Sequence, residues 1–386
     1  MNKTILSLLA LFIAANADSS LKDALYNSKL SFNGRVFYFD RNFDRPNTPN
    51  SKALTAGGIA KIETKELSEA KIGAAYYGSY LLGVTQRNDG VSSGLLEQTS
   101  GNNISLLGEL YFEQTYGKTT FTAGRQRLFT PLANDHDLRL LPSSYEAITL
   151  KTEAIDKNIV EIGYIKRYTG FASKYNAFKD ETHIWGKRGL SYVYIQNKNI
   201  DAATLRAQYI KALDGKNIAV KDYRYFDAAY EPSFGTIKLQ YGGNDYAGAN
   251  NSLMYGALAE VKTDLMDVGA VYDKIIGNSF KAVESGAMYT DWQQGYTNYE
   301  RSEAVGGYIT IRPASNLSLK VGKVWVRALN DSAKDDFTES NIDFWYEPNK
   351  SNKLRIRYSD KDQTPWTNIE DRKDFRVAYY FGFAKP

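Results

Sequence analysis

The sequence predicts an all-β protein, a transmembrane antiparallel β-barrel of about 18 strands in a single domain. Three observations favour this fold. Extended segments alternate apolar and polar side chains, short turns alternate with long loops, and 13% of the residues are aromatic while cysteine is absent. Because each strand of such a barrel is apolar on one face only, averaging the hydropathy along the chain hides the membrane-spanning strands. The mean hydropathy of -0.45 therefore does not argue against a membrane protein.

The first residues have the layout of a secretory signal peptide. Lys3 is followed by an apolar run, 5–14, and Ala15-Asn16-Ala17 then forms a small-x-small cleavage site. The apolar run is too short to span a membrane as a helix, which needs about 20 residues. We therefore expect residues 1–17 to be removed as a signal peptide and residues 18–386 to form the barrel in a bacterial outer membrane.

The final extended segment, Phe375–Phe383, shows the alternation most clearly. Its odd positions are all large and apolar, whereas its even positions are Arg, Ala, Tyr and Gly. A period of two over this length predicts a strand with one apolar face. An aromatic-rich last strand also looks like the signal by which the barrel-assembly machinery recognises outer-membrane barrels. It departs from that pattern in the tail Ala384-Lys385-Pro386, which follows the final aromatic residue.

The same alternation recurs along the whole chain, and two kinds of connector separate the segments. Further strands are expected around 30–36, 104–114, 148–151, 203–209, 253–261, 307–313 and 353–358. Short connectors rich in turn residues lie at 116–118, 156–158, 232–235, 314–316 and 348–350, and longer polar or Gly-rich ones at 41–51, 83–103, 170–187 and 275–301. Short turns on the periplasmic side and long loops outside are the asymmetry of an outer-membrane barrel.

Aromatic residues gather where strands are expected to end. Examples are Phe37–Phe39, Tyr76-Tyr77, Trp345-Tyr346 and Tyr379–Phe383. Outer-membrane barrels carry aromatic girdles at both membrane interfaces, so this pattern favours a barrel surrounded by outer-membrane lipids. The alternative is a Tyr-rich soluble sandwich or β-helix, in which Leu, Ile and Val would dominate the buried faces.

Strand parity assigns basic residues to the lumen. If Leu354 and Ile356 face lipid, then Lys353, Arg355 and Arg357 face inward, because a basic side chain facing lipid at mid-depth costs roughly 2–4 kcal/mol. Cations lining a narrow aqueous pore raise the local concentration of anions. The alternative is that they are only solvated lumen residues. By the same parity the inward basic set also includes Arg35, Lys151, Arg206, Arg312, Lys320 and Arg376, and the acids Glu109, Glu113 and Glu260 share the lumen.

The register near Gly322 is ambiguous, because Trp325 and Arg327 suggest a β-bulge. The segment 124–146 breaks the alternation altogether. It follows the fifth expected strand, so it is the third external loop, and it is apolar and contains two prolines, Pro131 and Pro142. Such a loop fits better folded into the lumen, where it narrows the channel.

This loop resembles the constriction segment of the OprD family of substrate-specific outer-membrane porins. The resemblance rests on Gly124, Gln126, Pro131, Asn134, Asp135, Arg139, Leu140 and Pro142, which occur in the family's order. Asn316–Val321 and Val324–Arg327 also look like the family's fifteenth strand. The resemblance runs along nearly the whole mature chain and is strongest at the loop. It implies an 18-stranded barrel, able to associate as a homotrimer, that takes up small hydrophilic solutes carrying carboxylates.

The resemblance also implies a ladder of basic lumen residues that faces an acidic or carbonyl-lined wall. It carries over Arg139 and Asp135 as loop residues and Lys320 as a ladder residue, whereas Arg355, Arg357 and Arg376 rest on parity. The residues expected along the solute path or at its constriction are Arg35, Arg125, Arg127, Asn134, Asp135, Asp137, Arg139, Ser143, Lys320, Arg355, Arg357 and Arg376.

An enzyme is the main alternative from another class. Two histidines, His136 and His183, fall in expected loops, and Ser143 and Ser144 follow the first of them. No nucleophile elbow or oriented base is visible, so a hydrolytic site is not expected. Asp135-His136-Asp137 could bind a metal, but adjacent residues on an extended segment point in opposite directions. We therefore expect no catalysis, no metal and no cofactor.

Two further alternatives concern other kinds of barrel. A structural or adhesin barrel would work through its external loops and would not need a constricting loop. A non-specific general porin would have a wide eyelet and little preference for anions. A nucleic-acid partner is not expected, because the formal net charge of +4 is too small.

Overall fold

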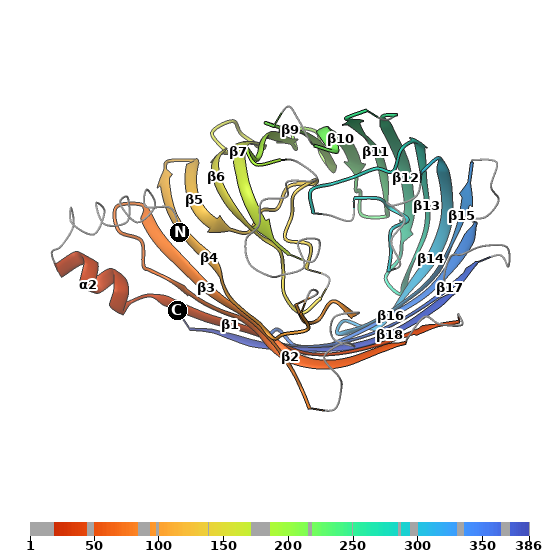
Figure 1. Cartoon of the computed structure of the whole chain (residues 1–386), viewed down its shortest axis with the longest axis horizontal. Helices are drawn as coiled ribbons and strands as arrows, with labels where there is room; N and C mark the ends of the chain where they lie inside the picture. Colours follow the sequence, from red (N-terminus) through yellow and green to blue (C-terminus); the bar gives the residue numbers. More distant parts are fainter. Residues whose placement is uncertain are drawn as a thin grey trace.

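The computed structural model describes residues 19–44, 50–83, 93–97, 100–137, 139–170, 186–214, 218–248, 250–284, 287–293, 300–329, 336–363 and 371–385. These residues form one antiparallel sheet of 18 strands, in which each strand pairs with its neighbours in sequence and β18 pairs with β1 (Figure 1). The sheet is therefore a closed barrel, which confirms the predicted fold class. Closure leaves no edge strand open to pair with another chain.

The strands are regular and most are long enough to cross an apolar layer. The first nine are β1 Lys29–Phe43, β2 Ser51–Glu63, β3 Ala70–Leu81, β4 Ile104–Tyr116, β5 Thr119–Gln126, β6 Ser144–Thr152, β7 Asn158–Thr169, β8 Leu190–Asn197 and β9 Ala203–Ala212. The others are β10 Val220–Tyr230, β11 Gly235–Tyr246, β12 Ser252–Lys262, β13 Met266–Gly277, β14 Ser302–Ala314, β15 Leu317–Ala328, β16 Phe337–Asn349, β17 Asn352–Gln363 and β18 Arg372–Lys385.

The two faces of the sheet differ as the alternation predicts. Outward side chains are apolar and exposed, for example Ile148 at 50%, Leu239 at 56% and Val268 at 47%, whereas the neighbouring Thr149 and Gln240 point inward and are buried. In a transmembrane barrel the outward apolar face contacts lipid and the inward face contacts water or inserted loops. Among the described residues, no helix is long and apolar enough to cross a membrane.

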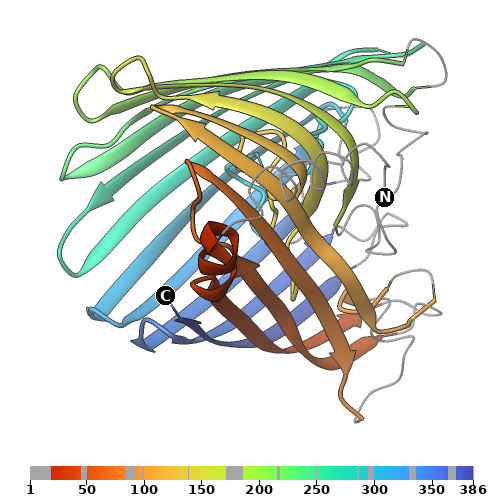
Figure 2. The ribbon, with the colours of Figure 1, turned by 90° about the vertical axis from the view of Figure 1, so that its left-hand side faces the viewer.

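Short turns and long connectors lie at opposite ends of the barrel. A short helix, α2 Ser19–Tyr26, precedes β1, and both it and the end of β18 lie at the end of the short turns (Figure 2). At the other end, the described parts of the connectors 127–143 and 278–301 leave β5 and β13 and enter the barrel (Figure 1). We call them loop L3 and loop L7. The expected inward fold of the third loop is thus observed, and L7 is a second inward loop.

The predicted bulge at Gly322 is wrong. The β15–β16 register is continuous from Leu317–Tyr346 to Val326–Phe337. Regular alternation points Lys320 inward and leaves Lys323, Trp325 and Arg327 on the outward face. Lys323 lies 5.7 Å from the centre of the Trp325 ring, and Arg327 forms an ion pair with Glu303, so both cations have neighbours outside the lumen.

The outward face should reject a charge that the lumen accepts. We expect Leu239→Lys to lower the free energy of unfolding by roughly 2–4 kcal/mol, because Leu239 faces the apolar layer. The matched variant Asn33→Lys, on the lumen face of β1, should cost less than about 1 kcal/mol. Denaturant unfolding of the two variants in lipid bilayers tests this. Equal losses would contradict the assignment of the two faces.

Candidate functional site

Arginines from three adjacent strands and from L3 gather on one wall of the lumen. We call Arg41 of β1, Arg357 of β17, Arg372 and Arg376 of β18, and Arg139 of L3 the arginine cluster. The ring of Phe39 lies at its centre, with its centroid 4.9 Å from the guanidinium carbons of Arg41 and Arg376 and 5.2 Å from that of Arg139. Strand pairing brings the groups together, since Arg41 is opposite Asp374 and Arg376 is opposite both Phe39 and Arg357.

The fully buried carboxylate Asp374 binds this cluster together. It accepts hydrogen bonds from Arg41 Nε and Nη2 at 2.8 and 2.9 Å and from Arg376 Nη2 at 2.7 Å. Arg372 Nε lies 3.8 Å away. Bidentate arginine–carboxylate pairs of this kind are strong and directional. Asp374 therefore fixes the arrangement of the guanidinium groups but cannot neutralise all of them.

Arg357 has no carboxylate partner in the described part of the chain to offset its charge. Among the described residues it forms no hydrogen bond or ion pair, although it is only 5% exposed. Its opposite neighbour is another arginine, Arg376, whose Nε also lacks a hydrogen-bond partner in the described part of the chain. Like charges directly opposite on a sheet repel. An anion that reached these groups would relieve that repulsion.

Loop L3 contributes to the same positive field. Arg139 is 8% exposed. Burial, reinforced by the charges of Arg376, Arg41 and Arg357, lowers the pKa of the Arg139 guanidinium well below its usual range. The backbone carbonyl of Arg139 accepts a hydrogen bond of 2.6 Å from Arg35, so the loop is tied to β1 beside the cluster.

Below the cluster, towards the short-turn end, the cations lie against aromatic rings. The guanidinium of Arg35 is 4.7 Å from the centre of the Tyr380 ring, and that of Arg355 is 4.3 Å from the centre of the Trp345 ring. The two rings stack with their centroids 6.0 Å apart. Arg355 Nε also donates to Asp343 at 2.9 Å. Arg35, Arg355, Arg357 and Arg376 thus form one continuous wall, as parity predicts.

Lys320 lies on the same side of the lumen but in an aromatic environment. Its Nζ is 3.6 Å from the centre of the Tyr308 ring and 5.2 Å from that of Trp292 in L7. Cation–π contacts of this kind hold an ammonium group in place without neutralising it. Lys320 on β15 is opposite Asp343 on β16, and Asp343 is opposite Arg357 on β17. Lys320 therefore extends the basic wall across two more strands.

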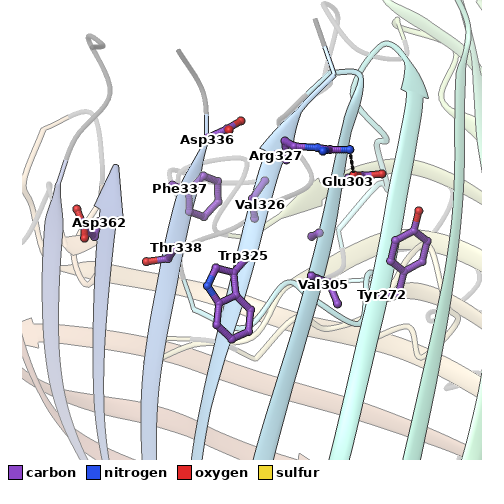
Figure 3. Close-up of a pocket in the computed structure, with 11 residues that line it drawn as sticks. Tyr272, Glu303, Val305, Trp325, Val326, Arg327, Asp336, Phe337, Thr338 and Asp362 are labelled. Atoms are coloured by element: carbon purple, nitrogen blue, oxygen red, sulfur yellow. Dashed lines mark hydrogen bonds and ion pairs between the residues drawn. The ribbon is translucent and has the colours of Figure 1, made fainter. Parts of the chain in front are cut away.

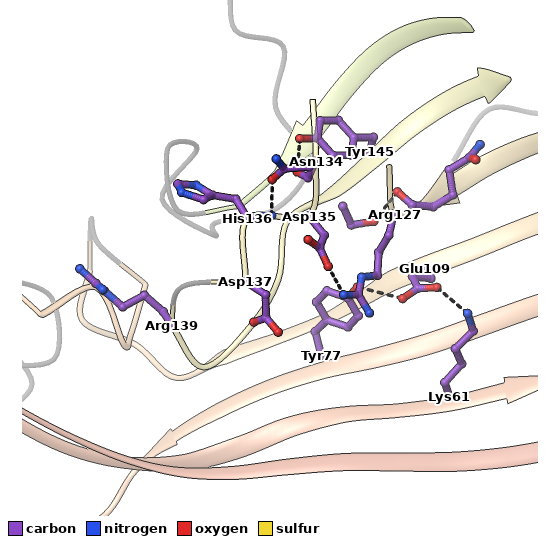
Figure 4. Close-up of polar contacts among 12 residues, drawn as sticks. Lys61, Tyr77, Glu109, Arg127, Asn134, Asp135, His136, Asp137, Arg139 and Tyr145 are labelled. Carbon is purple, nitrogen blue, oxygen red and sulfur yellow. Dashed lines mark hydrogen bonds and ion pairs between the residues drawn. The ribbon is translucent and has the colours of Figure 1, made fainter. Parts of the chain in front are cut away.

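Loop L3 is held by polar contacts among its own residues (Figure 4). Arg127 forms an ion pair with Asp135, and Asp137 pairs with Arg35 on β1. The carbonyl of Asn134 accepts a hydrogen bond of 2.6 Å from the Tyr145 hydroxyl. Arg127, Asn134, Asp135 and Asp137 therefore take part in one set of contacts. Asn134 and Asp137 connect the loop to the barrel wall.

Two predicted path residues do not line the lumen. Arg125 lies beside inward Gln126, and adjacent strand residues face opposite sides, so Arg125 lies outward with Phe121. There it pairs with Glu146 at 4.0 Å. Ser143 is fully buried where L3 joins β6, and its amide donates to the Asp135 carbonyl. It anchors the loop and does not contact the path.

The sequence predicts a polar external connector at 275–301. This prediction misses the inward fold of L7. The buried carboxylate of Asp273 accepts hydrogen bonds from the Thr290 amide at 2.7 Å and the Thr290 hydroxyl at 2.8 Å. Asn244 exchanges two hydrogen bonds with the backbone of Lys281. The sequence does contain a signal for the inward fold of L7, because part of the segment is apolar. Its apolar residues include Phe280, Val283, Met288 and Trp292.

The two inward loops also hold each other. The Val283 amide donates to the Leu132 carbonyl at 2.9 Å, and the Asn134 amide donates to the Glu284 carbonyl at 3.0 Å. His136 Nδ1 and Glu284 Oε1 share a hydrogen bond of 2.6 Å. His136 thus serves as a contact between loops. No metal-binding cluster of His, Cys, Asp and Glu occurs in the described ranges, and His183 lies outside them.

A large groove crosses β13 to β17 towards the end of the long connectors. It measures about 640 Å³ and is lined by exposed Val305 and Trp325 and by the Arg327–Glu303 ion pair (Figure 3). Trp325 and Val305 point away from the lumen. These two side chains therefore line the groove from the outward face of the sheet, whereas buried Ala304, Val326 and Phe337 line it from the inward face.

The fold is shared with several solved bacterial structures. The barrel superposes on Acinetobacter baumannii OccAB2 with a TM-score of 0.79 and 16% identity, over 94% of this chain and 100% of that one. Pseudomonas aeruginosa OccK9 (OpdG) gives a TM-score of 0.78 at 15% identity, with the same coverage. Pseudomonas aeruginosa OpdK, solved with vanillate, gives 0.78 at 14% identity, again over 94% and 100%.

Comparison by sequence is uninformative, because no protein-family model matches the chain and no curated protein matches it. At these identities the structural likeness establishes the 18-stranded barrel.

Release of L7 should widen the lumen. We expect Asp273→Ala to raise the mean single-channel current and to increase its fluctuations. The reason is that the Thr290 donors lose their buried acceptor, which weakens the attachment of L7 by about 1–3 kcal/mol. Asp245→Ala, which removes an outward carboxylate paired with Arg224, is the control and should conduct like the parent. Planar-bilayer recording distinguishes them. A current through Asp273→Ala identical to that of the parent would show that Asp273 does not hold L7 in the lumen.

Proposed function

We propose that this chain is an outer-membrane porin through which small hydrophilic solutes diffuse passively, and that it favours anionic solutes, carboxylates in particular. The observation that carries the proposal is the arginine cluster on the wall formed by β1, β17 and β18. A closed barrel with an apolar outward face and a polar lumen supports passage through a membrane. The cluster supports the preference for anions.

The local charge balance gives the direction of the preference. The five arginines of the cluster lie close to three carboxylates, Asp374, Glu339 and Asp343, and Asp343 is already paired with Arg355. Within the described residues the wall is therefore positive. In a narrow lumen with low-dielectric walls, such a field concentrates anions and excludes cations.

Guanidinium groups also suit carboxylates in geometry. The planar fork of arginine can donate two parallel hydrogen bonds to a carboxylate. Arg376, Arg357, Arg355 and Arg35 follow one another along the wall, so a carboxylate could pass from one to the next without being fully dehydrated. One of the channels similar in fold was solved with vanillate, which carries a carboxylate, and this agrees with the proposal.

L3 and L7 form the selective part of the path in this proposal. L3 places Arg139 against the basic wall, where Asp137 pairs with Arg35, and both loops narrow the lumen. The rest of the scheme includes export with removal of residues 1–17 and insertion by the barrel-assembly machinery. The outward aromatic residues of β18, Tyr379, Phe381 and Phe383, support recognition by that machinery.

Removal of two wall charges should reduce anion selectivity. In a gradient of potassium chloride, we expect the reversal potential of the parent channel to show preference for chloride. The double variant Arg355→Ser, Arg357→Ser should lower the anion-to-cation permeability ratio by about threefold or more, because the field in the lumen weakens.

Arg327→Ser is the matched control, since it removes an arginine from the outward face. It should leave the reversal potential unchanged. A double variant with the parent's reversal potential would contradict the role of the basic wall. A parent channel without ion preference would favour a non-specific general porin.

A further inference from the structure

A second group of basic residues lies on the opposite face of the sheet, outside the lumen. It is centred on Arg125 of β5, Glu146 of β6 and Arg167 of β7, which are successive partners across the sheet. Their inward neighbours Tyr145 and Tyr168 stack on each other inside the barrel, so these three side chains point outward. This position is independent of the solute path.

The central carboxylate is bound on both sides. Glu146 Oε2 lies 2.6 Å from Arg167 Nη2 and 4.0 Å from Arg125 Nε. Arg125 Nη1 also donates to the Leu107 carbonyl at 3.2 Å. Arg167 Nε is buried and lacks a hydrogen-bond partner in the described part of the chain. Two guanidinium groups thus share one carboxylate, and donor capacity remains.

Further cations extend this group along the rim. A bulge between Glu146 and Ala147 adds Lys166, whose ammonium donates to the Lys187 carbonyl. Lys187 and the next residue, Arg188, are exposed. We call Arg125, Glu146, Lys166, Arg167, Lys187 and Arg188 the outer basic patch. Five cations and one carboxylate give +4, and Asp214, which accepts from the Lys187 amide, reduces this to +3.

The barrel wall is low at this position. β5 and β6 have 8 and 9 residues, whereas the neighbouring β4 has 13 and continues beyond the upper end of β5. At about 3.3 Å per residue and a tilt of about 40°, the shorter strands rise roughly 20–23 Å. The apolar band of an outer-membrane barrel is about 25 Å tall. The patch therefore lies where lipid headgroups of the outer leaflet must come closest to the middle of the membrane.

The geometry points to a binding site for a lipid whose headgroup carries phosphate, on the outer basic patch. Exposed Phe121, Ile148 and Ile162 lie below the patch on the same face and would contact the acyl chains. Arginine and lysine above them would bind the phosphate by charge-assisted hydrogen bonds. A second copy of this chain fits less well, since a symmetric contact through this face would bring two positive patches together.

The site can be tested with the purified full-length chain in detergent. Native mass spectrometry with added lipid A, which carries two phosphates, should show retained lipid on the parent protein. Arg167→Gln, Lys187→Gln should weaken this binding by about tenfold. Arg327→Gln is the matched control, because Arg327 is also outward and paired with a glutamate. It should bind lipid A within about twofold of the parent.

Several outcomes would overturn the site. The double variant could bind lipid A as tightly as the parent, or the Arg327→Gln control could lose as much affinity as the double variant. The parent could also bind dephosphorylated lipid A as tightly as lipid A. Displacement of lipid A by an equal concentration of inorganic phosphate would assign the patch to a free anion. Unchanged lipid binding with loss of oligomers in light scattering would assign it to a second copy.

Folding of each variant is checked by heat-modifiable gel mobility. Should Arg167→Gln disturb folding through Glu146, the variant Lys187→Gln, Arg188→Gln removes two exposed cations outside the Glu146 ion pairs. This second double variant should also bind lipid A more weakly than the parent. Ion selectivity should stay that of the parent in both, which separates this site from the proposed channel function.

Discussion

The packing of like-charged guanidinium groups on one wall of the lumen is the constraint on which the rest of the structure depends. Arg357 and Arg376 are directly opposite each other, and Arg41 and Arg139 share the ring of Phe39 with Arg376. Such an arrangement is stable only where buried acids, aromatic faces and a rigid sheet hold it. Asp374 supplies the carboxylate, Phe39 supplies the ring, and closure of β18 on β1 supplies the rigidity.

The inserted loops follow from that constraint. L3 brings Arg139 to the wall and is tied to it through Arg35. L7 crosses from β13 and rests on Asp273 and on L3, so neither loop stands alone in the lumen. Because each loop buries backbone groups that need partners, the acids and amides of the wall are used for anchoring. Arg357, which has no carboxylate partner among the described residues, remains available to a passing anion.

Strand parity predicted the fold and much of the basic wall, because a period of two assigns each residue to a face from its position alone. Arg35, Arg355, Arg357 and Arg376 were placed correctly by this rule. It fails where the chain leaves the sheet. Arg125 was assigned to the solute path as part of the segment 124–146, which was expected to be loop. In the structure it still belongs to β5, where inward Gln126 beside it decides the face. Phe39 and Asp374 organise the cluster only through pairing between the first and last strands, which sequence patterns do not reveal.

The same limit applies to L7. Its apolar residues are spaced irregularly among polar ones, and their partners lie on β11, β13 and L3, far away in the sequence. The inward fold of L3 was predictable because proline and apolar residues are concentrated there. The contact between the two loops, from Val283 to Leu132 and from His136 to Glu284, depends on where both loops end inside the barrel.

Single-channel block by three solutes of matched size tests the central claim most directly: propionate, propionamide and propylammonium added to the parent channel. Charge is the main difference among them, so a positive wall must rank them in that order. We expect propionate to interrupt the current at the lowest concentration, propionamide to act weakly and propylammonium to act least. Block by propylammonium at or below the concentration needed for propionate would contradict an anion-attracting lumen.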